Sequence, residues 1–236
     1  MPSTVFISDL HLDSARPAVI QALAAFLEKN THCDGLYILG DLFEVWLGDD
    51  DDSPIAQEVT RLLKQYSDSG PSLYLMQGNR DFLLGDDFCR AVGGQLLQDP
   101  VVVDLYGTPT LLMHGDSLCT DDAEYQAFRK TARDPKCQAD LLSRSLDERK
   151  AFAAHLRSVS KESNSNKAQD IMDVSADEVA KVMAEHGVTR LIHGHTHRPA
   201  QHDLNSGVRW VLGDWEQYGW AIEVTSDNIE LFKFHI

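Results

Sequence analysis

The sequence predicts an α/β fold, because short β-rich runs alternate with helical patterns through its first half. The β-rich runs at residues 4–7, 36–39 and 73–76 are separated by helical patterns at residues 17–29 and 54–67. Such alternation is typical of βαβ units built around a sheet. A polar cluster also follows each run directly, and in such folds ligand-binding loops converge at the carboxyl ends of strands.

The first helical pattern, residues 17–29, begins with Pro17, which suits the first turn of a helix. Its apolar residues recur at helical spacing, so they should form one stripe that packs on the sheet. These residues are Val19, Ile20, Leu23, Phe26 and Leu27.

The middle of the chain changes character after residue 117. Residues 101–103 and 110–113 are expected to form two further strands around a turn at Gly107. Residues 121–170 then contain two or three charge-rich helical patterns. We therefore expect one domain spanning residues 1–236, with a helical lid inserted at approximately residues 118–172.

The last part of the chain returns to the α/β pattern. A helix is expected at residues 175–186, with Ser175 as its N-cap, Glu178 in the capping-box position and Gly187 as its stop. Further strands are expected at residues 190–193, 209–212, 220–224 and 229–234, with a turn at residues 226–228.

The composition is that of an ordinary globular protein, with 43% hydrophobic and 25% charged residues. Apolar runs stay shorter than the roughly 20 residues of a membrane span, and the N-terminus lacks the pattern of a secretory signal. We therefore expect a cytoplasmic protein. The cysteines form no CxxC pair, which indicates reduced thiols. They are Cys33, Cys89, Cys119 and Cys137.

The net charge of −16 argues against nucleic acid as a partner. The charge is uneven, because residues 121–170 hold ten Lys and Arg against nine Asp and Glu, about +1, while the rest carries about −17. An anionic partner could dock on this window, or its basic residues could simply face solvent.

Five polar clusters follow predicted strands and together contain seven side chains able to bind metal. These are Asp9, His11, Asp41, Asn79, His114, His195 and His197. Alternation along extended backbone places Asp9 and His11 on one side, and likewise His195 and His197. Oxygen and nitrogen ligands without cysteine suit Mn²⁺, Fe²⁺ or Zn²⁺. The sequence therefore predicts a metal site at one edge of the sheet.

The order of these clusters, DxH, GDxx, GNxD, H and GHxH, resembles the calcineurin-like metallophosphoesterase family over nearly the whole chain. The resemblance implies a four-layer α/β/β/α sandwich with two metal ions bridged by Asp41. It assigns Asp9, His11 and His197 to one ion, and Asn79, His114 and His195 to the other. Two cations about 3.5–4 Å apart can share a hydroxide and clamp the attacking and departing oxygens.

Arg80 departs from many relatives, which carry histidine after the Gly-Asn pair. Arginine cannot donate a proton at neutral pH, so an alkoxide would leave without acid assistance. A phosphate monoester, with a second pKa of about 6, can leave as an anion. Arg80 therefore favours a pyrophosphate substrate, whose charge it would stabilise. Alternatively, Arg80 is a structural partner of Asp81.

Residues 40–50 and 78–83 narrow the resemblance to the UDP-2,3-diacylglucosamine diphosphatases of Gram-negative lipid A synthesis, and residues 160–174 are similar to their lid. The implied reaction yields UMP and 2,3-diacylglucosamine 1-phosphate (lipid X), with metal-bound hydroxide attacking the α-phosphorus and Mn²⁺ as the usual metal. The implied catalytic residues are Asp41, Asn79, Arg80 and His195. The implied substrate contacts are Asn79, Arg80, Asp122, Ser160, Asn164, Lys167 and His195, with Tyr125 and Arg157 as further candidates.

A lid also suits a substrate with two acyl chains, because each buried methylene contributes about 0.8 kcal/mol. The apolar residues of this segment could line an acyl groove or could form an ordinary core between its helices. They are Phe128, Leu141, Leu142, Phe152, Leu156 and Val159. The basic lid could rest on an anionic membrane, as a peripheral contact on the cytoplasmic face of the inner membrane. Outside the motifs, Glu44 and Asp116 could orient ligand imidazoles or could have surface or capping roles, and His193 is expected to be packed beside the site.

Two other functions are also compatible with the sequence. The same fold could act as a phosphodiesterase or pyrophosphatase on a soluble nucleotide. It could also be a scaffold without catalysis, although all seven potential ligands are present.

Overall fold

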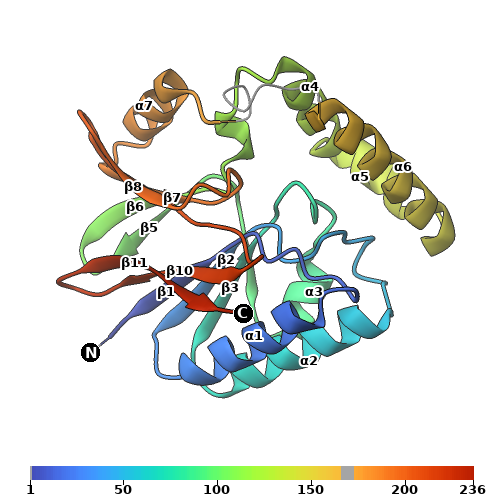
Figure 1. The fold of residues 1–236 in the computed structure, drawn as a ribbon, viewed down its shortest axis with the longest axis horizontal. Coiled ribbons are helices and arrows are strands. Elements are labelled where there is room, and N and C mark those ends of the chain that lie inside the picture. The colour runs from blue at the N-terminus through green and yellow to red at the C-terminus, as the bar shows by residue number, and fades with distance from the viewer. Residues whose placement is uncertain (1, 166–172) are drawn as a thin grey trace.

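Two β-sheets lie face to face at the centre of the molecule, with helices on their outer faces (Figure 1). The computed structural model describes residues 2–165 and 173–236, with side chains described for residues 2–158 and 173–236. The six-stranded sheet has the order β11-β10-β1-β2-β3-β4, and the five-stranded sheet has the order β5-β6-β7-β9-β8.

Parallel strands form the middle of the six-stranded sheet. Its bounds are β1 (Thr4–Ile7), β2 (Gly35–Leu39), β3 (Ser72–Met76), β4 (Gln95–Leu97), β10 (Tyr218–Val224) and β11 (Ile229–His235). β1 to β4 pair in parallel, and β10 and β11 add an antiparallel edge. The residues after β1, β2 and β3 therefore emerge at the same edge.

The five-stranded sheet has a parallel centre between antiparallel edges. Its bounds are β5 (Val101–Leu105), β6 (Thr108–Leu112), β7 (Arg190–His193), β8 (Ala200–Leu204) and β9 (Gly207–Val211). β6, β7 and β9 pair in parallel, whereas β5 and β8 run antiparallel to their neighbours.

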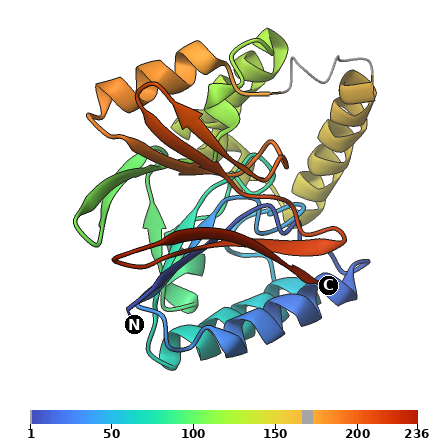
Figure 2. The ribbon, with the colours of Figure 1, turned by 60° about the vertical axis from the view of Figure 1, so that its left-hand side comes forward.

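Three apolar cores separate four layers. Helices α1 (Pro17–Lys29), α2 (Pro54–Asp68) and α3 (Asp86–Ala91) share a core with the six-stranded sheet. Phe6 and Leu39 meet Leu112 and Ile192 between the sheets. Helix α7 (Ala176–Glu185) packs on the other side of the five-stranded sheet (Figure 2). The expected α/β/β/α sandwich is confirmed.

Most predicted elements are found within a few residues of their expected bounds. The apolar stripe of α1 is buried as expected. Helix α7 starts after Ser175 and ends before Gly187, whose φ is +64°. However, Ser175 makes no capping hydrogen bond, and Glu178 pairs with Lys181 instead. Four short elements were not predicted, namely α3, β4, the 3-10 helix η1 (Asp116–Leu118) and β8.

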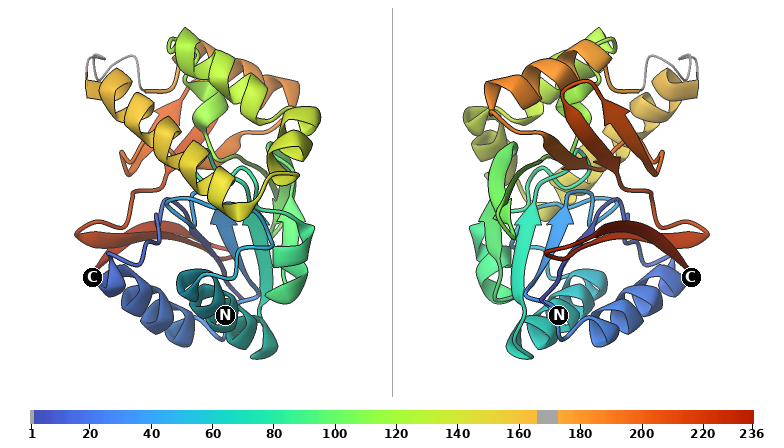
Figure 3. Two further views of the ribbon diagram at one scale, coloured as in Figure 1. Left: turned by 90° about the vertical axis from the view of Figure 1, so that its right-hand side faces the viewer. Right: turned by 90° about the vertical axis from the view of Figure 1, so that its left-hand side faces the viewer.

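Three further helices cover one end of the sandwich (Figure 3). They are α4 (Ala123–Ala132), α5 (Pro135–Leu142) and α6 (Leu146–Ser165), and we call them the three-helix segment. They agree with the helices expected between residues 121 and 170, although residues 166–172 lie outside the described residues. The role of this segment as a lid stays a prediction. In the described chain, the helices are too short or too polar to cross a bilayer.

Candidate active site

The polar clusters at the strand ends meet at one edge of the sandwich. Asp9, Asp41 and Asn79 follow β1, β2 and β3, while His114 and His195 follow β6 and β7. The carboxyl ends of the central strands of both sheets thus supply the site, as the sequence predicted.

Backbone conformation at this edge is unusual. Among non-glycine residues of the described chain, positive φ occurs at Tyr106 and at Asp9, His11, Asp41, His195 and His197. The last five are all predicted metal ligands. Non-glycine residues in this region cost of order 1–3 kcal/mol each and cluster at functional sites. These five backbone conformations therefore lower the stability of the fold, and they orient the five side chains toward the site.

All seven predicted ligands form one continuous chain of contacts no longer than 3.8 Å. Nε2 of His11 lies 3.8 Å from Asp41 and 3.3 Å from Nε2 of His197, which itself lies 3.4 Å from Asp9. Nε2 of His114 lies 3.8 Å from the other oxygen of Asp41. Asn79 closes the chain, because its Oδ1 lies 2.9 Å from His114 and 2.8 Å from His195.

The donor atoms fit divalent cations. Asp9, His11 and His197 can share one ion, as can Asp9, Asp41 and His114, because the ligand atoms within each group lie within 4.8 Å of one another. Asp9 is 0% exposed, yet its Oδ1 accepts no hydrogen bond from the described residues. A buried carboxylate oxygen without a donor is costly unless a cation or water satisfies it.

Gly78 is required for the close approach of β2 and β3 at this site. A Cβ placed on Gly78 would overlap Oδ1 and the backbone nitrogen of Asp41. Any other residue would push the loop before Asn79 away from Asp41.

Charge in the site is strongly coupled. Burial works to lower the pKa of His114, but the carboxylates of Asp41, Asp116 and Asp9 outweigh it and raise that pKa to about 9. Burial and the charge of His114 lower the pKa of His195 to about 4. Burial opposes ionisation of Asp9, but His197 and the other histidines hold its pKa well below the usual range. The site thus favours a charged His114 beside a neutral His195.

Asp81 holds the loops together and is not a partner of Arg80. Its carboxylate accepts from the backbone nitrogens of Leu42 at 2.8 Å and Gly78 at 2.7 Å. Burial and the neighbouring Asp41 raise the pKa of Asp81 to about 6. The alternative reading of Arg80 as a partner of Asp81 is therefore wrong.

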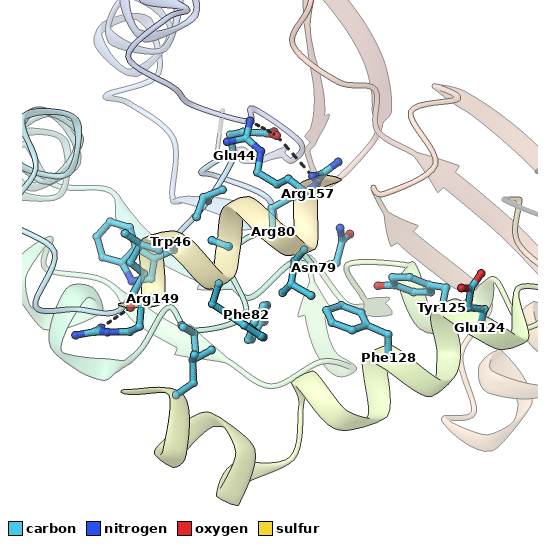
Figure 4. Close-up of a pocket in the computed structure, with 17 residues that line it drawn as sticks. Glu44, Trp46, Asn79, Arg80, Phe82, Glu124, Tyr125, Phe128, Arg149 and Arg157 are labelled. Atoms are coloured by element: carbon cyan, nitrogen blue, oxygen red, sulfur yellow. Dashed lines mark hydrogen bonds and ion pairs between the residues drawn. The ribbon is translucent and has the colours of Figure 1, made fainter. Parts of the chain in front are cut away.

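Arg80 instead shares Glu44 with Arg157 of α6, as Figure 4 shows. Glu44 lies 3.6 Å from Nη1 of Arg80 and 3.1 Å from Nη2 of Arg157. Its other oxygen lies 3.2 Å from Nδ1 of His11, outside hydrogen-bond geometry. Both arginine side chains are one-third to one-half exposed, at 33% and 47%. They are therefore accessible to an anion at the mouth of the site.

Helix α4 contributes other residues that the sequence singled out. Asp122 is its N-cap and accepts from the backbone nitrogen of Tyr125 at 3.0 Å. The Tyr125 ring stacks on His195, with 5.8 Å between centroids, and its hydroxyl donates to Asp116 at 2.7 Å. Asp116 thus binds Tyr125 and not a ligand imidazole, contrary to the expectation.

Three expected substrate contacts are not placed by the structure. Lys167 lies outside the described residues, and so do the side chains of Ser160 and Asn164. Their roles stay predictions.

An apolar pocket begins at the metal-ligand candidates and runs under the three-helix segment (Figure 4). Asn79 and Arg80 line one end. The apolar lining consists of Val45, Trp46, Leu47, Phe82, Leu83, Phe128, Leu141, Phe152, Ala153 and Leu156. Four residues expected in an acyl groove are therefore present. Leu142 is 42% exposed and lies outside this lining, and the side chain of Val159 is outside the described residues.

His193 lies beside the predicted ligands, as expected from the sequence. His193 is fully buried beside the site, where its Nδ1 lies 2.8 Å from the Gly194 carbonyl and its Nε2 3.1 Å from Arg209. Burial and Arg209 lower the pKa of His193 to about 3, so it stays neutral. Asp49, which follows Gly48, is structural, since its carboxylate accepts from the backbone nitrogens of Gly85 at 3.0 Å and Phe88 at 2.9 Å at the start of α3.

Comparison with known proteins supports the family that the sequence motifs resemble. The calcineurin-like phosphoesterase family matches residues 2–199. This chain belongs to the calcineurin-like phosphoesterase family. Three similar members of the family are each named UDP-2,3-diacylglucosamine hydrolase. This phosphoesterase is 50% identical to the one from Marinobacter nauticus, with 96% of this chain and 95% of that protein covered. It is 48% identical to that of Cellvibrio japonicus, covering 99% and 100%, and 48% to that of Salmonella typhi, covering 98% and 99%.

Two solved structures resemble this phosphoesterase in fold. An archaeal phosphodiesterase has a TM-score of 0.51 at 11% identity, with 99% of each chain covered. Vps29 of Entamoeba histolytica in complex with zinc has a TM-score of 0.50 at 11% identity, with 99% of this chain and 98% of that chain covered. At this identity the likeness concerns the fold alone.

Proposed function

We propose that this phosphoesterase hydrolyses the pyrophosphate bond of UDP-2,3-diacylglucosamine, giving UMP and 2,3-diacylglucosamine 1-phosphate for lipid A biosynthesis. The main support for this proposal is that the cluster of metal-ligand candidates and the apolar pocket are continuous, because Asn79 belongs to both. A phosphate-cleaving centre joined to an apolar pocket suits a substrate with a nucleotide head and acyl chains. The names of relatives 48–50% identical over nearly their full lengths support the same substrate.

The metal centre we propose holds two divalent cations, most simply Mn²⁺. Asp9, His11 and His197 would hold one, Asn79, His114 and His195 the other, and Asp41 would bridge them. When bound, such a pair supplies an activated water and neutralises phosphate charge. The protein holds these groups in place before substrate binds. It does so through the strained backbone and through the hydrogen bonds that Asp81 accepts from the loops.

Arg80 and Arg157 would bind the pyrophosphate. In the structure both pair with Glu44, so their guanidinium groups already face the site mouth. Charge-assisted contacts from Arg80 would stabilise the charge that develops on the departing phosphate. This phosphate needs no general acid, because it is a good anionic leaving group.

The three-helix segment would act as a lid over the acyl chains. Phe128, Leu141, Phe152 and Leu156 line the pocket on the side of this segment. Each methylene that they shield from water would contribute about 0.8 kcal/mol to binding.

We further propose a peripheral contact with the cytoplasmic face of the inner membrane. Phe128 and Leu142 are 37% and 42% exposed on the three-helix segment, which lies in the basic window of the chain. Apolar side chains among basic ones suit an anionic lipid surface.

The decisive experiment is hydrolysis of UDP-2,3-diacylglucosamine with Mn²⁺ in H₂¹⁸O. We expect one ¹⁸O atom in UMP, because water attacks the α-phosphorus. Label confined to the lipid phosphate would place the attack at the other phosphorus. Faster turnover of unacylated nucleotide pyrophosphates or cyclic nucleotides would replace the substrate assignment, and a protein inert toward all of them would be a scaffold.

A further inference from the structure

Helix α4 carries three hydrogen-bond donors at four-residue spacing, Tyr125, Arg129 and Arg133, the last at its C-cap. Residues four apart lie on one face of a helix, so the three donors project in one direction. Tyr125 and Arg129 both donate to Oδ2 of Asp116, at 2.7 and 2.9 Å. Tyr125, Arg129 and Arg133 all contact residues of the sandwich rather than residues of the neighbouring helices.

Arg133 makes three hydrogen bonds to a single loop. Nη1 donates to Oε1 of Gln77 at 2.7 Å, and Nη2 donates to the carbonyls of Gln77 and Gly78, each at 3.1 Å. The side chain of Arg133 is 18% exposed. A planar guanidinium suits such a fork of acceptors, whereas lysine offers a single point charge.

This loop leads directly into Asn79. The carbonyl of Gly78 belongs to the peptide group whose nitrogen is that of Asn79, so Arg133 fixes the orientation of that peptide. On the far side of Asn79, the Arg80 nitrogen donates to Oδ1 of Asp41 at 2.7 Å. Asn79 is thus held from both sides, with its Oδ1 between His114 and His195.

We propose that Arg133 is a positioning residue that couples helix α4 to the Asn79 side of the metal centre. Arg129 adds a second strut, because its partner Asp116 stands two residues after His114 and is completely buried. This inference rests on the proposed dinuclear centre. It makes the base of the three-helix segment part of the metal site and not a separate cover.

The test is a Mn²⁺ titration of metal-stripped protein, followed by calorimetry and by the EPR signal of free Mn²⁺. Arg133→Ala should weaken one of the two Mn²⁺ equivalents about 10–100-fold, the usual effect of losing an outer-shell partner. The other equivalent should be unchanged. Arg133→Lys should fall between the parent and the alanine variant.

Lys130→Ala is the matched control, since it removes an equal charge from an exposed position of the same helix. Its titration should match that of the parent. Hydrogen exchange gives an independent readout, because coupling is reciprocal: Mn²⁺ should slow exchange in residues 123–132 of the parent and do so less in Arg133→Ala.

A folded Arg133→Ala protein with the parent's Mn²⁺ titration would overturn the proposal, even if its melting temperature fell. Neither readout uses the acylated UDP-sugar, so a wrong substrate assignment leaves the result intact. A parent protein that binds no Mn²⁺ would overturn both this inference and the proposed centre.

Discussion

Arg80 gives this site a different chemistry from a site that carries a proton donor at the same position. Its backbone nitrogen bonds Asp41, while its side chain is partly exposed and pairs with Glu44. The two roles are separable, because truncating the side chain leaves the backbone contact in place.

We therefore expect Arg80→Ala to lower kcat about 100- to 1,000-fold, the usual loss when one donor to transition-state charge is removed. Its Mn²⁺ affinity should match the parent's. Steady-state kinetics with UDP-2,3-diacylglucosamine measures this. Arg90→Ala, which removes an exposed arginine on α3, is the control. Undiminished kcat in Arg80→Ala would remove Arg80 from the reaction.

A second residue-level prediction concerns protons. With a pKa of about 9, His114 is protonated at neutral pH, and a metal ligand must be neutral. Binding at that side should therefore release a proton below pH 9. Affinity should rise by up to about tenfold per pH unit from pH 7 to 9, since one unit corresponds to about 1.36 kcal/mol, and should level off above. Calorimetry in buffers of different ionisation enthalpy counts the protons. Zero release at pH 7 would contradict a charged His114.

At the scale of elements, the sequence predicted what depends on local pattern. The apolar stripe of α1 and the motif after each central strand were enough to place the predicted ligands on one edge. The short strand β8 was missed because its five residues carry little apolar periodicity. The contacts of Arg129, Arg133 and Asp116 join positions distant in sequence, although the four-residue spacing on α4 was a visible signal.

Helix α6 is anchored by Arg149, whose side chain is 3% exposed and bonds the Leu47 carbonyl and Asp50. Hydrogen bonds to a charged group contribute about 1.5–3 kcal/mol. Arg149→Ala should loosen α6 and raise KM for the acylated substrate about tenfold, with Mn²⁺ affinity unchanged. Kinetics and hydrogen exchange over residues 146–158 measure this. Lys150→Ala, exposed at 57%, should behave as the parent. An unchanged KM would mean that α6 does not cover the substrate.

On the scale of the whole molecule, the buried carboxylates of the metal site lower the stability of the metal-free fold. Asp9, Asp41 and Asp81 are all buried within one edge of the sandwich, at 0%, 2% and 0% exposure. Asp81 stabilises the loops through backbone nitrogens, yet burial and the charge of Asp41 raise its pKa to about 6. Repulsion between buried carboxylates is costly, and the charged His114 offsets only part of it until a metal cation binds. Bound metal should therefore contribute to stability as well as to chemistry.

Mn²⁺ at 100 times its dissociation constant adds about 2.7 kcal/mol per site, which for a chain of this size raises Tm by roughly 5–10 °C. Asp41→Asn should remove most of that response, because the bridging charge is lost. Without metal at pH 10, where His114 is neutral and no longer pairs with Asp41, Asp41→Asn should melt above the parent, since it relieves the repulsion with Asp81. Scanning calorimetry with EDTA and with Mn²⁺ compares the four states. If metal-stripped Asp41→Asn melts below the stripped parent at pH 10, the carboxylate pair is not a strained element of the fold, and the stability that metal adds has another origin.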